Sequence, residues 1–316
     1  MSPHPTLSRR QALFAGFCLC CLPARGWAAE AVETPFAMQE IAPGLFFQKG
    51  LVENATAANG DAIANTGFVV GRDCVAVIDP GGDLACGRRL RAAVRAATSL
   101  PIRYVVLTHV HPDHHFGAGA LLADAPVFVG HARLPQALAS RGPYYQAALD
   151  GILGAGQAGP VVPPTLLVAD AAKLDLGGRV LSLHAHGAAH TDNDLSVLDE
   201  ASGTLMSADL VFAERVPSLD GDLRGWLREL AVLRAMGAAR VVPGHGPLRL
   251  SWEEASRPIE GYLTALLTQT RAAIRDGLPI EAAVGTVAAG ERERWALFDD
   301  YNGRNVTEAY KELEWE

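Results

Sequence analysis

Histidine and aspartate residues that could bind metal ions gather in four places along the chain. The densest is 108–115, with the sequence Thr-His-Val-His-Pro-Asp-His-His, and 184–194 contains three more histidines and two aspartates. The other two are Asp209 and His245, which lies between two glycines. Imidazole suits zinc or iron, and a carboxylate adds the negative charge that holds a second cation. These residue types predict a metal centre rather than a polar surface loop.

Each of the four places follows a short apolar run of the kind that forms a buried strand. These runs are residues 104–107, 180–183, 204–206 and 241–242. Asp209 alone would more often be a turn residue, and His245 alone a loop histidine. Because sites in open α/β sheets form at strand ends, the shared position after a strand favours one common site.

Short apolar strands alternate with amphipathic helices along the rest of the chain. Further strands are expected at 45–47, 63–70, 74–78, 127–129, 165–168 and 195–198. Helices are expected at 84–97, 134–139, 223–236, 253–275, 280–288 and 305–313. The alternation predicts an α/β protein that becomes mainly helical after Pro247.

The composition excludes several classes of protein. The chain has 316 residues, of which 49% are apolar and 20% charged, so it can bury a sizeable core and is too apolar for disorder. The formal net charge is −8 and no basic patch is visible. We therefore expect a small-molecule substrate and do not expect nucleic-acid binding.

Residues 1–29 have the pattern of an export signal. Arg9 and Arg10 precede an apolar run at 12–22, and small residues at 26–29 offer a cleavage site. The run is too short to span a bilayer, so no stable membrane anchor is expected. This pattern predicts twin-arginine export to the periplasm, and removal of the signal would change the net charge from −8 to −11.

Two cysteines remain after such cleavage, Cys74 and Cys86. Cys74 opens the strand at 74–78, and Cys86 lies near the start of the following helix. The strand would separate them by about 15 Å, which is beyond the reach of a disulfide. We therefore expect two unpaired structural cysteines.

The motifs together resemble those of the metallo-β-lactamase superfamily. They are Thr-His-x-His-x-Asp-His at 108–114, His190 with Thr191, Asp209 after a strand, and Gly-His-Gly at 244–246. The resemblance implies a four-layer αβ/βα sandwich over residues 30–316, including a helical C-terminal segment at 251–316. It also implies that the site lies along one edge of the two sheets.

The resemblance further implies a dinuclear site. Metal one would be held by His109, His111 and His190, and metal two by Asp113, His114 and His245, with Asp209 bridging them. Four other histidines match no ligand position and are expected to be supporting or structural: His115, His131, His184 and His186.

The family hosts many reactions, so the fold does not settle the function. Where class B β-lactamases carry Cys or Ser, this chain has Asp209, which resembles the glyoxalase II and general hydrolase pattern. The leader, residues 62–70 and residues 304–316 resemble the periplasmic quinoprotein relay system zinc metallohydrolase group. That group is related to sulfur-oxidation and quinoprotein dehydrogenase systems, so a periplasmic quinoprotein or cytochrome partner is a further expectation.

The site chemistry predicts a hydrolase of thioesters, esters or lactones. Two zinc ions per chain can share a water, lower its pKa toward about 7 and present hydroxide to a carbonyl that one ion polarises. Asp113 and Asp209 would hold the metals and orient the proton of the nucleophile. Asp192 or Asp194 would fix a ligand imidazole through its second nitrogen.

Three alternatives stay open. The first is an iron-dependent persulfide dioxygenase that uses His109, His190 and Asp209 as two histidines and one carboxylate. The second is a metallo-β-lactamase, and the third is a non-catalytic metal-binding accessory protein. The helical segment after Pro247 is expected to cover the site, with Trp295, Phe298 and Tyr301 either in the substrate wall or in ordinary helix packing.

Overall fold

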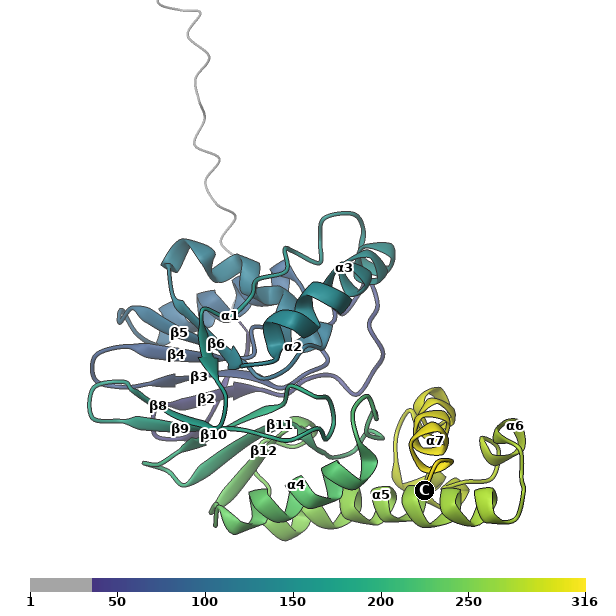
Figure 1. Ribbon diagram of the computed structural model, residues 1–316. Helices are drawn as coiled ribbons and strands as arrows, with labels where there is room; N and C mark the ends of the chain where they lie inside the picture. The colour runs from purple at the N-terminus through teal and green to yellow at the C-terminus, as the bar shows by residue number, and fades with distance from the viewer. Residues whose placement is uncertain (1–35) are drawn as a thin grey trace, which may run out of the picture. The chain divides into compact units, whose positions relative to one another are not determined.

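Two β-sheets lie face to face at the centre of the computed structural model, which describes residues 36–316 (Figure 1). The predicted export signal at 1–29 lies outside the described residues. The seven-stranded sheet has the order β1-β2-β3-β4-β5-β6-β7, and the five-stranded sheet has the order β12-β11-β10-β9-β8. Strands β4 to β7 are parallel to one another, as are β11 and β12.

The element bounds are as follows. The first sheet contains β1 (Gln39–Ala42), β2 (Leu45–Gln48), β3 (Thr66–Val70), β4 (Val75–Ile78), β5 (Ile102–Leu107), β6 (Val127–His131) and β7 (Leu166–Val168). The second contains β8 (Ala171–Asp175), β9 (Val180–Ala185), β10 (Leu195–Asp199), β11 (Thr204–Phe212) and β12 (Arg240–His245). The helices are α1 (Leu84–Ala97), α2 (Pro112–His115), α3 (Leu134–Leu153), α4 (Leu223–Ala235), α5 (Trp252–Arg275), α6 (Ile280–Ala283) and α7 (Phe298–Leu313), with 3₁₀ turns at Phe116–Asp124 and Ala289–Arg294.

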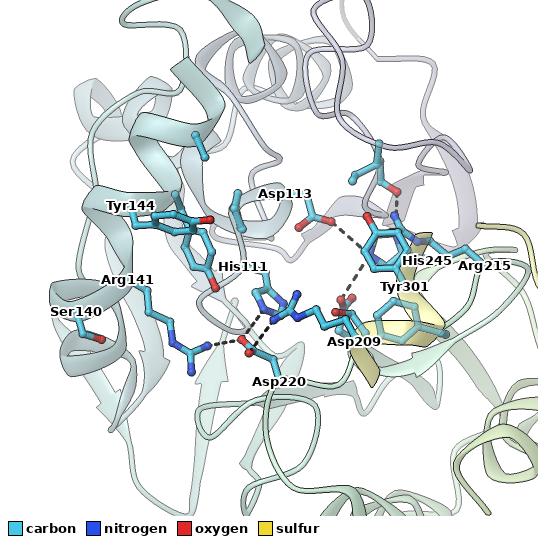
Figure 2. A pocket seen from close by; sticks show the side chains of 17 residues that line it. His111, Asp113, Ser140, Arg141, Tyr144, Asp209, Arg215, Asp220, His245 and Tyr301 are labelled. Atoms are coloured by element: carbon cyan, nitrogen blue, oxygen red, sulfur yellow. Dashed lines mark hydrogen bonds and ion pairs between the residues drawn. The ribbon is translucent and has the colours of Figure 1, made fainter. Parts of the chain in front are cut away.

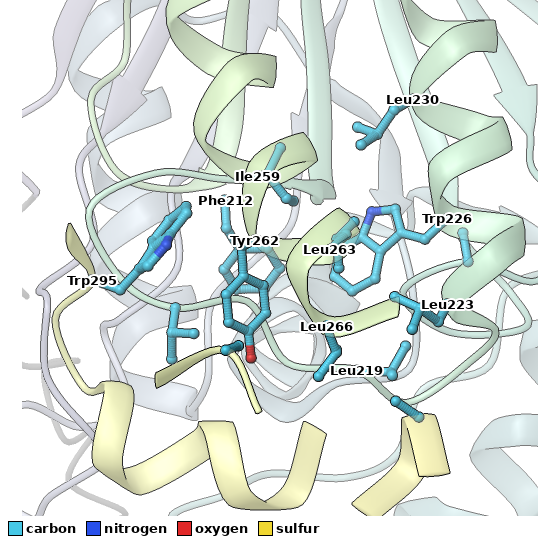
Figure 3. Packing of buried hydrophobic residues seen from close by; sticks show 14 of the residues in the cluster. Phe212, Leu219, Leu223, Trp226, Leu230, Ile259, Tyr262, Leu263, Leu266 and Trp295 are labelled. Atoms are coloured by element: carbon cyan, nitrogen blue, oxygen red, sulfur yellow. The ribbon is translucent and has the colours of Figure 1, made fainter. Parts of the chain in front are cut away.

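Three apolar cores define the layers. Residues of both sheets, including Val106 and Val242, form the core between them. A second core packs α1 and α3 against the outer face of the seven-stranded sheet. The third packs α4, α5 and α7 against the five-stranded sheet, with Trp226 and Tyr262 fully buried at its centre (Figure 3). The fold is therefore the predicted αβ/βα sandwich with a helical C-terminal segment.

Capping side chains fix where the main helices begin. The Asp83 carboxylate accepts a hydrogen bond from the Cys86 backbone at 2.6 Å, which starts α1 at the predicted residue. Ser251 and Glu254 form a reciprocal capping box at the start of α5. These contacts satisfy backbone N–H groups that have no partner inside the helix.

The structure corrects four predicted elements. The helix predicted at 280–288 ends at Ala283, and the helix predicted at 305–313 begins earlier, at Phe298. Helix α3 was predicted to end at 139 but continues past Pro143 to Leu153, because Leu149 packs against Phe116 and Ala158 in a small core. The strand predicted at 63–70 begins only at Thr66.

Two further sequence features are clear in the described residues. Cys74 and Cys86 are both buried and unpaired, as predicted. Within residues 36–316, none of the helices combines the length and apolar character needed to cross a membrane.

Candidate metal centre

The seven predicted ligands come from the carboxyl ends of three strands and from one loop. Residues 109–114 follow β5, and His190 lies in the loop between β9 and β10. Asp209 lies within β11, and His245 is the last residue of β12, which runs parallel to β11. Parallel pairing of β11 and β12 aligns their ends. The packing of the two sheets against each other then brings these ends to the residues that follow β5 in the other sheet, at one edge of the sandwich.

Three imidazoles and one carboxylate converge in the first group. The His111 Nδ1 atom lies 3.1 Å from His109 Nε2 and 2.8 Å from His190 Nε2. The Asp209 Oδ2 atom lies 3.4 Å from His190 Nε2 and 3.7 Å from His109 Nε2. These four side chains form one group that could hold a metal ion.

A second group lies on the other side of Asp209. The His245 Nε2 atom lies 3.3 Å from Asp113 Oδ2 and 3.4 Å from Asp209 Oδ2, and His114 Nε2 lies 3.0 Å from Asp209 Oδ1. Asp113, His114 and His245 form a separate group of candidate ligands. Asp209 thus faces both groups, which is the position predicted for a bridging carboxylate.

The ring nitrogen on the far side of each imidazole already has a partner. The five pairs are His109 Nδ1 with Thr108 Oγ1 (3.0 Å), His111 Nε2 with Asp220 (3.1 Å), His114 Nδ1 with Asp79 (2.8 Å), His190 Nδ1 with the Ser218 carbonyl (2.7 Å) and His245 Nδ1 with the Ile63 carbonyl (2.9 Å). The carboxylates and carbonyls accept hydrogen bonds, and the Thr108 hydroxyl donates its own proton to Asp79 at 2.8 Å and can therefore only accept from His109. All five partners thus place a ring proton on the outer nitrogen. The inner nitrogens are then free to offer lone pairs.

Burial and neighbouring charge set the protonation states of the group without a cation. Burial lowers the pKa of His109 well below its usual value and that of His190 to about 3. Burial by itself would raise the pKa of Asp209, but His114 and His245 outweigh it and hold that pKa well below its usual value. His109 and His190 are therefore neutral beside an ionised carboxylate. Burial alone would lower the pKa of His114 and of His245, but the Asp209 charge outweighs it and raises both pKa values, so a divalent cation would replace the protons of these two imidazoles.

The backbone at Gly244 packs closely against the Asp209 side chain. A Cβ atom added to Gly244 would collide with Asp209 Oδ1. Asn65 braces the same loop, because its side-chain nitrogen donates to the Pro243 and Gly246 carbonyls at 2.8 and 3.1 Å. The Asn65 backbone also donates to the Gly244 carbonyl at 2.7 Å, which explains why residues 63–65 leave the predicted strand.

A cavity of about 810 Å³ opens over the candidate ligands (Figure 2). His111, Asp113, Asp209 and His245 form part of its floor. Its wall includes Tyr144 and Tyr145 from α3 and Tyr301 from α7. Trp295 and Phe298, two of the three wall candidates in the sequence, instead lie in the third core, 5% exposed each, which is the ordinary packing alternative.

The other four histidines of residues 36–316 lie outside both groups of candidate ligands. His115 is buried and accepts a hydrogen bond from the Val162 backbone at 3.2 Å, and burial lowers its pKa to about 4. His131 accepts a hydrogen bond from the Arg133 backbone at 3.0 Å. His186 contacts Glu229 and Ser196, and together with His184 and Glu229 it forms a third small cluster.

The supporting carboxylates differ from those expected. Asp194 accepts hydrogen bonds from the Thr191 backbone and hydroxyl, and Asp192 accepts one from Asn193, so neither contacts a ligand imidazole. Asp79 and Asp220 take that role instead. Asp79 directly follows β4, the strand that pairs with β5, so its place after a strand was a usable signal. Asp220 lies in a loop whose sequence carries no such signal.

A family model described as the metallo-beta-lactamase superfamily matches residues 59–245 of the chain. The solved metallo-beta-lactamase from Pontibacter korlensis is 19% identical with a TM-score of 0.58, over 72% of this chain and 98% of that one. Pisa1, a stereoselective inverting sec-alkylsulfatase from Pseudomonas sp., is 17% identical with a TM-score of 0.66, over 87% of this chain and 50% of that one.

A third solved structure, the mono-zinc form of FIM-1 from Pseudomonas aeruginosa, is 18% identical with a TM-score of 0.54. It is matched over 74% of this chain and 99% of that one. The search of curated proteins found no match. At these identities the solved structures show a shared fold, and their activities are properties of those proteins.

Proposed function

The chain belongs to the metallo-β-lactamase superfamily, and from that membership we propose that it is a metal-dependent hydrolase with a two-zinc centre. The observation that carries the proposal is the convergence of seven ionisable side chains, from four separate parts of the sequence, at one edge of the sandwich.

Two orphaned atoms support a cation at this place. His114 Nε2 and Asp209 Oδ1 are buried and have no partner with hydrogen-bond geometry, and their 3.0 Å contact is an ion pair only when His114 carries a second proton. Leaving buried polar atoms unpaired costs about 1–3 kcal/mol each or more for a charged group. A cation between them would satisfy both, so the residues present fit a bound metal.

Following the family motif, we propose how the candidate ligands divide between two ions. His109, His111 and His190 would hold one ion, Asp113, His114 and His245 the other, and Asp209 would contact both. Two zinc ions, when bound, supply Lewis-acid chemistry and a water of lowered pKa. Imidazole and carboxylate ligands suit zinc, and iron remains the alternative metal.

The chain's own side chains keep the site in one geometry. Asp220, Asp79 and Thr108 each hold a ligand imidazole in one orientation through its outer nitrogen. Asp113 and Asp209 offer carboxylate oxygens at the cavity floor, where they can orient the proton of an attacking water. Positioning of this kind is a large part of the catalytic power of a metal site.

We propose thioesters, esters or lactones as the substrates. The support is Asp209, whose carboxylate replaces the Cys or Ser of the class B β-lactamases and matches the general hydrolase pattern. A periplasmic location and a link to a quinoprotein dehydrogenase or sulfur-oxidation system are part of the same proposal. They rest on the resemblance of residues 1–29, 62–70 and 304–316 to the relay-system group.

A purified chain would test the proposal directly. We expect about two zinc ions per chain by elemental analysis, and turnover of aryl thioesters, aryl esters or lactones well above that of a chromogenic cephalosporin. His109→Ala should lose metal and activity together, whereas His184→Ala, which removes a histidine outside the site, should lose neither. Iron-dependent oxygen uptake with a persulfide, or cephalosporin hydrolysis alone, would contradict the proposal. Metal binding without any turnover would favour an accessory protein.

A further inference from the structure

Three arginines line the cavity of a chain whose net charge is −8. Arg141 comes from α3, Arg304 from α7, and Arg215 from the segment after β11. In Figure 2, Arg141 lies near Asp220 on one side of the candidate ligands, and Arg215 lies beside His245 and Tyr301 on the other. The positive charge is thus placed around the floor of the cavity.

Arg141 and Arg304 already have a structural task. Both form ion pairs with the single carboxylate of Asp220, the Arg304 pair at 2.9 Å. Asp220 in turn contacts His111 at 3.1 Å. These two arginines therefore hold the carboxylate that orients a candidate ligand.

Arg215 has no such task. It is 4% exposed, and no carboxylate among residues 36–316 lies within ion-pair distance of its guanidinium. The Nη1 atom donates to the Glu53 carbonyl at the long distance of 3.5 Å, and Nε is buried without any partner. The Tyr301 ring lies 4.9 Å from its Cζ atom.

An unpaired charge in this position is unfavourable unless a ligand completes it. A guanidinium stays protonated when buried, and a buried charge without a counter-ion is strongly destabilising. A ligand anion is the missing partner that this arrangement favours.

We propose that Arg215 binds a carboxylate group of the substrate, so that the substrate class is an anionic acyl compound rather than a neutral ester. Tyr301 packs beside the guanidinium and limits where that carboxylate can sit. Arg141 and Arg304 add to the positive potential that draws the anion into the cavity. This inference rests on the proposed hydrolase function.

Two matched substrates test it with the zinc-loaded protein. S-phenyl thiohemisuccinate carries a carboxylate, and S-phenyl thiopentanoate has a neutral chain of similar length. We expect wild type to prefer the anionic thioester in kcat/KM. Arg215→Met should lower that value by roughly 10- to 100-fold, the effect of a lost charge-assisted hydrogen bond, and leave the neutral thioester within about twofold. Arg257→Met, which removes an exposed arginine from α5, should change neither.

A binding measurement separates this inference from the hydrolase proposal. Succinate at constant ionic strength should raise the melting temperature of wild type and Arg257→Met and have a much smaller effect on Arg215→Met. If no thioester is turned over but this difference persists, the hydrolase proposal fails and the anion site stands.

Three outcomes would overturn the inference. Equal loss of both thioesters together with a lower melting temperature in Arg215→Met would make Arg215 a structural residue. Loss of the anionic preference in Arg304→Met but not in Arg215→Met would assign the carboxylate to the other side of the cavity. If wild type shows no preference for the anionic over the neutral thioester, the substrate is not an anionic acyl compound.

Discussion

Buried charged side chains have partners at one end of the two packed sheets and lack them at the other. At the end away from the cavity, the guanidinium of Arg179 meets the buried carboxylate of Asp199 in two contacts, at 3.0 and 2.7 Å. The same guanidinium donates to the Pro43 and Val70 carbonyls, so it also ties the five-stranded sheet to the seven-stranded sheet. At the cavity end, His114 Nε2 and Asp209 Oδ1 remain without partners.

The difference separates a structural polar cluster from a functional one. The Arg179 cluster is complete within the chain and stabilises the fold. Among the described residues, only histidines contact Asp113 and Asp209 at the cavity end, with no arginine or lysine in an ion pair with either carboxylate, which costs stability until a ligand binds. A polar cluster that its own chain leaves incomplete is therefore the better guide to function.

The largest expected effect comes from removing the carboxylate shared by both groups. Asp209→Ala should lower kcat/KM by about 1000-fold or more, because both candidate metals lose a ligand. Metal content, measured by elemental analysis, should fall in parallel. Full metal content in this variant would contradict the bridging assignment, and Arg179→Met provides the control, since it should keep its metal.

The same control variant should show a large effect on stability instead. Arg179→Met leaves the Asp199 carboxylate buried without its partner, so we expect a loss of about 3–5 kcal/mol in the free energy of unfolding. Urea unfolding followed by circular dichroism would measure it. A loss below about 1 kcal/mol would mean that the contacts between the sheets matter little.

A smaller effect, on zinc affinity, should follow when one candidate ligand loses the carboxylate that supports it. Asp220→Asn keeps the shape but weakens the contact with His111, so zinc affinity should fall by about 10- to 100-fold. Competition with a chromogenic chelator would measure the affinity. Asp192→Asn should leave the zinc affinity unchanged, because the Asp192 carboxylate accepts a hydrogen bond from Asn193 and none from a candidate ligand.

The smallest expected effect is a dependence of stability on pH. Burial would raise the pKa of Asp199, but hydrogen bonds from Arg179 and Ser202 outweigh it and lower that pKa. A lowered pKa in the folded state contributes stability above the unfolded value of about 3.9, and this contribution is lost as the pH falls through the folded value. Urea unfolding of wild type and Asp199→Asn should therefore give free energies that converge as the pH is lowered below about 4.

The sequence predicted the floor of the site better than its wall. The clusters that contain the seven candidate ligands were identifiable because histidine and aspartate followed apolar strands, and the family resemblance then selected the seven among them. Arg215 and Asp220 could not be identified from the sequence. The loop between β11 and α4 that contains them has no periodic pattern, and only packing determines its position. The extension of α3 was missed for a related reason, since contacts distant in sequence outweigh the tendency of Pro143 to end a helix.

The place of α7 in the sequence affects the order in which the site can be built during synthesis. All seven candidate ligands precede residue 246, whereas Tyr301 and Arg304 come from α7. Asn305 of the same helix donates to the Pro217 carbonyl and accepts from the Leu219 backbone, on either side of the Ser218 carbonyl that holds His190. A nascent chain can therefore gather its metal-binding side chains before the ribosome has delivered the helix that completes the cavity wall. A premature stop codon between residues 246 and 298 would yield a chain that contains every candidate ligand but lacks the part of the cavity wall that α7 supplies.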